Sequence, residues 1–217
     1  LNLEFQNYIN VILFSQVFLA VGSVIIFYKI NKIFFSQKIS FYSSLVFSFF
    51  PIHVYACSQI SSISLQTFFL LSYFYLFFQL NKKKNFLIIL AFSFISGLLM
   101  LLRGEFIIIL IFSIFYLFIF FKVKLKNVLL IMLISLITIS PYLIRNILIF
   151  DKITITKSLG FNLWKGNNIN SGVEGSEFMN EKLKEKVNAV HKDKMFRINI
   201  DKVFMEEATA NIINALE

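Results

Sequence analysis

The first two thirds of the chain consist of long apolar runs separated by short polar gaps. None of the runs alternates apolar and polar residues strictly. Their apolar character continues around the whole helical circumference, a pattern typical of buried or lipid-facing helices. Each run is about as long as a helix that crosses a thin hydrocarbon core, at about 1.5 Å rise per residue. The runs lie at about residues 8–28, 39–57, 63–80, 86–102, 106–121 and 127–144.

The composition excludes several protein classes. Hydrophobic residues make up 58% of the chain and charged residues 15%, whereas a soluble domain is about 45–50% apolar and about 25% charged. The composition therefore argues against a soluble enzyme, a disordered chain and a coiled coil. The single cysteine, Cys57, cannot form an internal disulfide or a cysteine-based zinc cluster. The phosphate-binding, dinucleotide-binding and HExxH motifs are absent, so we expect neither a cofactor nor a metal site.

The positive charge follows the gaps between the runs. Residues 1–150 carry eleven basic and two acidic residues, whereas residues 151–217 carry ten of each. Three lysines and no acid occupy each of the gaps 29–38, 81–85 and 122–126, and the other gaps hold no lysine. The positive-inside rule places the lysine gaps in the cytoplasm and the remaining gaps and the tail outside. This distribution indicates membrane topology rather than a nucleic-acid-binding surface.

The sequence therefore predicts an all-α polytopic membrane protein with about six transmembrane helices. We assign residues 1–147 to a transmembrane bundle and residues 148–217 to a soluble, extracytoplasmic segment that is mixed α/β or helical. The chain starts with Leu1 and stops within a helical pattern. We interpret it as an internal fragment of a larger membrane protein, truncated in the tail.

Two local features predict the packing of the runs. Pro51 and Pro141 lie inside runs, where each frees the carbonyl one turn back and bends the helix. Ser93 and Gly97 form a small-xxx-small pair, which allows another helix to approach closely.

The tail has mixed secondary-structure signals. Alternating β-branched and polar residues predict a short strand over 152–158, and the segment 167–175 has a loop composition. Helices are predicted at 176–190, with Ser176 as N-cap, and at 202–217. Their apolar stripes are Phe178, Met179, Leu183 and Val187 in the first helix and Phe204, Ala208, Ile212 and Leu216 in the second.

Two arginines of the membrane part are predicted at the outer face. Arg103 and Arg145 depart from the positive-inside bias. The planar guanidinium suits bidentate phosphate binding, so the two side chains could hold a lipid phosphate. In the alternative interpretation they extend to lipid headgroups, or Glu105 neutralises Arg103.

Further polar residues are candidate substrate contacts. His53, Cys57 and Ser61 lie one turn apart along the second run and form either a satisfied polar seam between helices or a substrate contact. Trp164 follows the outer membrane face and either stacks on a sugar ring or anchors or packs a loop.

Three stretches share a recognisable pattern. The first is Phe50-Pro51-Ile52-His53-Val54, continued by Ser61-Ser62-Ile63-Ser64-Leu65. The second is Gly97-Leu98-Leu99-Met100-Leu101-Leu102-Arg103-Gly104-Glu105. The third is Ser140-Pro141-Tyr142-Leu143-Ile144-Arg145-Asn146, then Phe150-Asp151-Lys152 and Gly160-Phe161-Asn162-Leu163-Trp164-Lys165-Gly166-Asn167-Asn168.

Their order and spacing resemble the bacterial glycosyltransferase family 39 proteins. These are polytopic enzymes of the dolichyl-phosphate-mannose protein mannosyltransferase type, related to the lipid A aminoarabinose transferase. The resemblance implies a location in the bacterial inner membrane and an active site at the outer face. It also implies transfer of a sugar from a polyprenyl-phosphate donor to a lipid, protein or glycan acceptor, with no nucleic-acid partner.

The resemblance also suggests roles for individual residues. Arg103 and Arg145 match basic positions that bind the donor phosphate, and Asn146 and Asn167 of the third stretch join His53 and Trp164 as substrate-binding candidates. The family's acidic catalytic residue, in the first outer loop, is expected upstream of Leu1. The first stretch departs from the family pattern because an acidic residue often follows the serine, where this chain has Ile63.

The resemblance favours a membrane glycosyltransferase, and we expect the chain as given to be catalytically inert without the upstream base. Glu105 is the remaining candidate for the base, although it is more simply the partner of Arg103. The alternatives are a glycan polymerase or ligase, a transporter-like protein without transferase activity, and a structural membrane subunit.

Overall fold

A computed structural model describes residues 2–155, 158–168, 179–190, 192 and 195–216, with side chains in the range 8–215. The ordered elements of this described part are all α-helices, and no strand occurs in it. The chain divides into two compact units, Leu1–Pro141 and Tyr142–Glu217.

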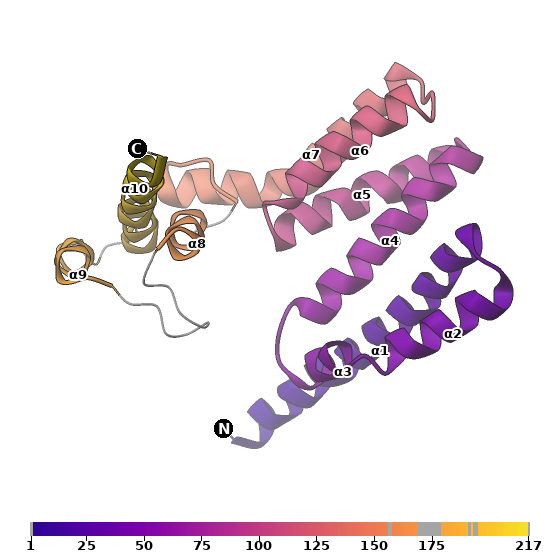
Figure 1. The fold of residues 1–217 in the computed structure, drawn as a ribbon, viewed down its shortest axis with the longest axis horizontal. Helices are drawn as coiled ribbons and strands as arrows, with labels where there is room; N and C mark the ends of the chain where they lie inside the picture. The colour runs from indigo at the N-terminus through magenta and orange to yellow at the C-terminus, as the bar shows by residue number, and fades with distance from the viewer. Residues whose placement is uncertain (1, 156–157, 169–178, 191, 193–194, 217) are drawn as a thin grey trace. The chain divides into compact units, whose positions relative to one another are not determined.

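The first unit is a bundle of apolar helices in which α1 and α4 run in the same direction and α2 and α5 run opposite to them (Figure 1). Helix α1 lies beside α2 and α4, and α4 also packs on α5. Many large apolar side chains face outward; Phe18, for example, is 75% exposed. Such surfaces are stable when lipid covers them. The helices are α1 (Asn2–Phe34), α2 (Gln37–Ser48), α3 (Pro51–Ser58), α4 (Ile63–Lys82), α5 (Phe86–Leu102), α6 (Phe106–Ile119) and α7 (Leu125–Phe150), the last of which continues into the second unit.

The structure confirms apolar helices at all the predicted runs but not the count of six spans. Three helices in the described part are long and apolar enough to cross a membrane, within Tyr8–Phe34, Ile63–Lys82 and Leu125–Phe150. The bent pair α2 and α3 makes a fourth if the two form one broken span. Helices α5 and α6 have 17 and 14 residues, so they are shorter than the about 20 residues of a usual span.

Both prolines have their predicted local effect on the carbonyl one turn back. Pro51 begins α3 after a break, and α2 and α3 are inclined by 48°. The carbonyl of Phe47 accepts a hydrogen bond from Phe50 N instead, at 3.2 Å. Pro141 lies inside α7, and there the Ser140 hydroxyl donates to the carbonyl of Ile137 at 2.8 Å. Neighbouring groups thus satisfy the backbone within an apolar environment.

The small-residue pair on α5 brings α7 into close contact, as predicted. The Ser135 hydroxyl donates to the carbonyl of Ser93 at 3.0 Å. A Cβ added to Gly97 would lie 2.5 Å from Cβ of Thr138 and 3.1 Å from the carbonyl oxygen of Ser135. Only a glycine fits at this helix crossing.

The three lysine gaps lie at the same end of the first unit (Figure 1). Two of these gaps touch, because the Lys84 ammonium donates to the carbonyl of Lys122 at 3.1 Å. The gaps 59–62 and 103–105, which hold no lysine, lie at the other end (Figure 1). The unit therefore has a lysine end and an opposite end, which we call the arginine end after Arg103.

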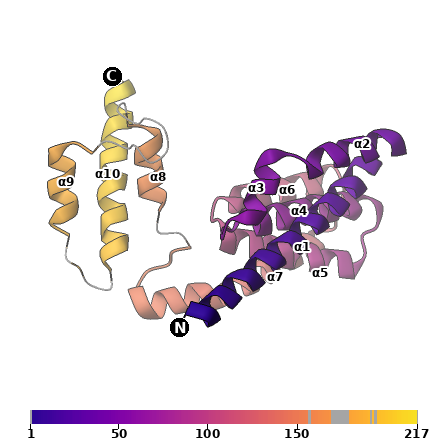
Figure 2. The same cartoon turned by 90° about the horizontal axis from the view of Figure 1, so that it is seen from below.

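The second unit has a small helical core of its own. Helix α10 (Phe196–Leu216) lies between α8 (Leu159–Gly166) and α9 (Glu181–Asn188) (Figure 2). The Asp201 carboxylate of α10 accepts hydrogen bonds from Gly160 N at 3.1 Å and Phe161 N at 2.9 Å, which satisfies free donors at the start of α8. The buried core consists of Trp164, Leu183, Phe204 and Ala208.

The predicted strand in the tail was wrong over its described residues. Residues 152–155 and 158 form no strand. Helix α7 extends to Phe150 and ends at Asp151, whose φ of 51° is left-handed. The following segment finds no partner strand among the described residues. Its Thr154 carbonyl instead accepts a hydrogen bond from the side chain of Asn146 at 2.7 Å.

The two helices predicted in the tail are present but start at other residues, and helix α8 was not predicted. The proposed N-cap Ser176 lies outside the described residues, and the cap of α9 is Asn180, whose side chain accepts from Leu183 N at 2.8 Å. Helix α10 starts at Phe196 rather than near residue 202. Five of the predicted stripe residues belong to the core or pack on it: Met179, Leu183, Val187, Phe204 and Ala208.

Candidate functional site

The arginine end of the first unit presents one exposed cation. Arg103 ends α5 as its C-cap and follows the last apolar turn. Its side chain is 55% exposed, and Nη1 donates to Oε1 of Glu105 at 3.0 Å. Glu105 stands at the N-cap of α6, but its side chain accepts no capping hydrogen bond from that helix. Its carboxylate is 65% exposed, so it partners Arg103 without closing the guanidinium off from a ligand.

Arg145 and Asn146 belong to the second unit. Arg145 is exposed, and its Nη1 donates to Oδ1 of Asn146 at 3.3 Å. Asn146 is 1% exposed, and its amide nitrogen is engaged with the loop after α7. Arg103 and Arg145 thus lie in different units, and their approach to each other remains a prediction.

Trp164 and Asn167 lie on and after α8. The Trp164 indole is 2% exposed and packs against the rings of Phe161 and Phe204, at centroid distances of 5.8 Å and 5.0 Å. This is the arrangement that the packing interpretation predicts, and a sugar ring reaches the indole only if this core opens. Asn167 is exposed, and its side chain donates to the carbonyl of Leu163 at 2.8 Å.

His53, Cys57 and Ser61 belong to a polar seam that connects three helices. The Cys57 thiol donates to the carbonyl of His53 at 3.2 Å, and the Ser64 hydroxyl of α4 contacts the Cys57 sulfur at 3.9 Å. The carbonyl of Ser61 accepts from Nε2 of Gln16 on α1 at 3.0 Å. The seam lies toward the arginine end, because α3 finishes and α4 begins there (Figure 1).

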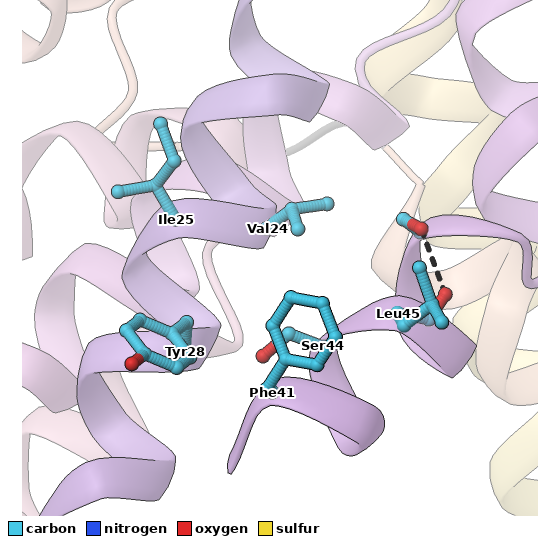
Figure 3. A pocket seen from close by; sticks show the side chains of 7 residues that line it. Val24, Ile25, Tyr28, Phe41, Ser44 and Leu45 are labelled. Carbon is cyan, nitrogen blue, oxygen red and sulfur yellow. Dashed lines mark hydrogen bonds between the residues drawn. The ribbon is translucent and has the colours of Figure 1, made fainter. Parts of the chain in front are cut away.

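Two apolar grooves open on the sides of the first unit. One, of about 450 Å³, lies between α5, α6 and α7 and includes Met100, Leu110 and Ser135. The other, of about 270 Å³, lies between α1 and α2; Figure 3 shows Val24, Ile25 and Tyr28 facing Phe41 across it. Neither groove is lined by a charged residue, so lipid chains suit them better than headgroups.

Acidic and metal-binding groups are sparse in the described part. Among the residues that the structure describes, no group of three or more His, Cys, Asp or Glu residues is arranged to hold a metal ion. Glu105 is the one acid among the described side chains of the first unit. Because it is bound to Arg103, its present geometry suits charge pairing better than proton abstraction.

A match to a protein-family model shows which family this chain belongs to. The model described as dolichyl-phosphate-mannose-protein mannosyltransferase matches residues 3–144, about two thirds of the chain. This chain belongs to that family. No curated protein and no solved structure matches it. Membership of the mannosyltransferase family makes the chain a membrane glycosyltransferase in general terms and confirms the resemblance found in its sequence.

The mannosyltransferase family match covers the first unit and most of α7. Arg103 and His53 fall inside it, and Arg145 is the first residue beyond it. The substrate candidates of the tail, Trp164 and Asn167, therefore lie outside the matched part. Their proposed roles stay predictions.

Gln16 and Ser64 complete the polar seam, and their part in it was not predicted from the sequence. The signal was present for Gln16, because an amide in the middle of an apolar run is costly unless it has a partner or a function. The signal for Ser64 was weak, since serines are common in the apolar helices of this chain and usually bond to their own backbone, as Ser72 does to Phe68 at 2.7 Å.

Proposed function

We propose that this chain takes part in transfer of a sugar from a polyprenyl-phosphate donor to an acceptor at the outer face of the membrane. The family match carries the proposal. It favours a glycosyltransferase over the polymerase, ligase and transporter alternatives. The acceptor is a lipid, a glycan or a protein.

The lysine end supports the choice of membrane face. All the lysine gaps gather at one end of the first unit (Figure 1), which is the cytoplasmic end by the positive-inside rule. The arginine end then faces outward in a bacterial plasma membrane. A lipid donor held with its phosphate at this end keeps its prenyl chain among the apolar helices.

Arg103 is proposed to bind the donor phosphate, with Arg145 as a second guanidinium. As the sugar leaves, negative charge grows on the phosphate, and a fixed cation stabilises it. Arg103 is suited to this because its exposed fork lies at the edge of the apolar helices. A carboxylate is still required to deprotonate the acceptor hydroxyl. We propose that Glu105 is not this base and that the described residues alone do not catalyse transfer.

Donor binding tests the role of Arg103. With the chain in lipid nanodiscs, Arg103→Lys should weaken binding of a polyprenyl-phosphate sugar about tenfold, because an ammonium cannot form the two parallel hydrogen bonds of the guanidinium. The matched control is Arg197→Lys on the exposed surface of α10, which should leave binding unchanged. Equal affinity of the wild type and Arg103→Lys would contradict the proposal.

A further inference from the structure

Three buried polar side-chain atoms in the described part of the first unit have no hydrogen-bond partner, and two of them, on Gln16 and His53, lie toward the arginine end. Gln16 is 6% exposed and His53 is 8% exposed. The Gln16 amide nitrogen is bound to Ser61, but its Oε1 is unpaired. The His53 ring stacks on Phe47 at a centroid distance of 4.5 Å, and its Nε2 is unpaired. An unpaired buried polar group costs about 1–3 kcal/mol, so two in one region call for a physical explanation.

The two atoms belong to one connected cluster, which we call the Gln16–His53 cluster and which comprises Gln16, His53, Cys57, Ser61 and Ser64. Hydrogen bonds join Cys57 to the backbone of His53 and Ser64 to Cys57. Gln16 is joined to Ser61, three residues before Ser64. Helices α1, α3 and α4 therefore meet here, and polar groups from all three surround the same part of the bundle.

The chemistry of the unpaired atoms defines a neutral ligand group. Gln16 Oε1 only accepts a hydrogen bond, whereas His53 Nε2 donates or accepts according to its tautomer. A hydroxyl group can satisfy either atom, because it can donate its hydrogen to Oε1 or accept a hydrogen bond from Nε2–H. No member of the cluster is an acid, a lysine or an arginine, so a phosphate has no counter-charge here. The cluster is complementary to a sugar hydroxyl.

The depth of the cluster agrees with a ligand that enters from the arginine end. Gln16 is thirteen residues from Lys29, which is about 20 Å along α1. Ser61 lies in the gap between α3 and α4, away from the lysine gaps. A sugar attached to a phosphate at the arginine end therefore has its hydroxyls on the same side of the membrane as the cluster.

We propose that the Gln16–His53 cluster binds a hydroxyl group of the sugar carried by the lipid donor. This inference rests on the proposed function. It assigns recognition of the sugar to Gln16 and His53 and recognition of the phosphate to the arginines. Neither Gln16 nor His53 takes part in a bond-forming step.

The test compares sugar-bearing and sugar-free lipids. Binding of polyprenyl phosphate carrying mannose, glucose or galactose, and of polyprenyl phosphate alone, is measured with the full chain in nanodiscs. Gln16→Leu and His53→Phe should each weaken the best-bound sugar lipid about tenfold, the value of one net hydrogen bond of about 1.4 kcal/mol. Binding of polyprenyl phosphate should not change. His53→Phe keeps a ring to stack on Phe47, so it should also preserve the fold.

A second buried amide on the same helix provides the control. Asn31 is 9% exposed and has an unpaired Nδ2, but it lies toward the lysine end of α1. Asn31→Leu should change neither affinity. Equal loss for both lipids in the cluster variants, or no loss for either, would overturn the inference while leaving the proposed function intact. If the wild type prefers no sugar lipid over polyprenyl phosphate, the inference is likewise wrong. If it binds none of the lipids, the proposed function fails as well.

Discussion

At the residue scale, the ion pair between Arg103 and Glu105 is compatible with both interpretations of Arg103, namely neutralisation by Glu105 and binding of a phosphate. The guanidinium is paired, as the neutralising interpretation requires, yet more than half of its side chain remains exposed. An exposed pair of this kind is worth about 0.2–1 kcal/mol. The phosphodiester of a polyprenyl-phosphate sugar has two free oxygens and one negative charge and can compete with so weakly held a partner, so we expect Glu105 to weaken ligand binding at Arg103 without preventing it.

Glu105→Gln should therefore strengthen binding of polyprenyl phosphate about two- to fivefold, since it removes the competing carboxylate. Titration of the lipid into nanodiscs that hold the chain measures this affinity. Glu206→Gln is the control, because Glu206 forms an equally exposed pair with Lys202 at 4.0 Å, and it should have no effect. Weaker binding by Glu105→Gln would show that the carboxylate supports the donor site.

At the element scale, the close contact of α5 with α7 depends on one glycine, Gly97, which has no Cβ to separate the helices. Gly97 faces Thr138 at a distance that no Cβ tolerates, and the bond from Ser135 to Ser93 lies one turn away. Interfaces between membrane helices rely on such close backbone approach, because lipid removes most of the hydrophobic driving force.

Gly97→Ala should destabilise the first unit by about 1–3 kcal/mol through overpacking. Reaction of Cys57, the single cysteine, with a thiol-specific dye during heating in detergent reports unfolding of this unit. Gly166→Ala is the control, because a Cβ there meets nothing within 4 Å. The double variant Gly97→Ala with Thr138→Gly should restore stability. An unchanged unfolding temperature in Gly97→Ala would refute the proposed close contact.

Sequence patterns predicted the elements whose causes are local. The apolar runs, the bend at Pro51 and the close approach at Gly97 all follow from residues within a few positions of the feature. Helix α8 was missed because its start is stabilised by Asp201, about forty residues later in the chain. The strand after α7 was wrong for a similar reason. Alternating β-branched and polar residues form a strand only where a partner strand exists. Here the side chain of Asn146 donates a hydrogen bond to the backbone carbonyl of Thr154 instead.

In the candidate site too, individual residues could be predicted from the sequence, but their connections through the fold could not. Arg103 and His53 stood out because charged and polar groups are rare in apolar runs, and both fall in the matched family region. The connection of His53 to Gln16 is not visible in the sequence, because it passes through Cys57, Ser64 and the backbone of Ser61. Only the fold shows that two of these buried atoms lack partners.

At the scale of the whole molecule, the helices of the first unit have two ends with different cations. The lysine gaps lie at one end of the first unit, and the gap between α5 and α6, which contains Arg103, lies with the start of α4 at the other (Figure 1). The lysine end is proposed to face the cytoplasm and the arginine end to hold the lipid donor. In this proposal the guanidinium of Arg103 binds the phosphate, and the side chains of Gln16 and His53 bind the sugar.

Photocrosslinking with a donor analogue tests the central claim most directly. A polyprenyl-phosphate sugar with a diazirine on the sugar is bound to the chain in nanodiscs and irradiated, and the labelled peptides are identified. We expect labels within residues 53–64 and 102–106, and an excess of the unmodified donor should remove them. Labels concentrated in the lysine gaps 29–38, 81–85 and 122–126, or labels that the unmodified donor does not displace, would contradict this claim.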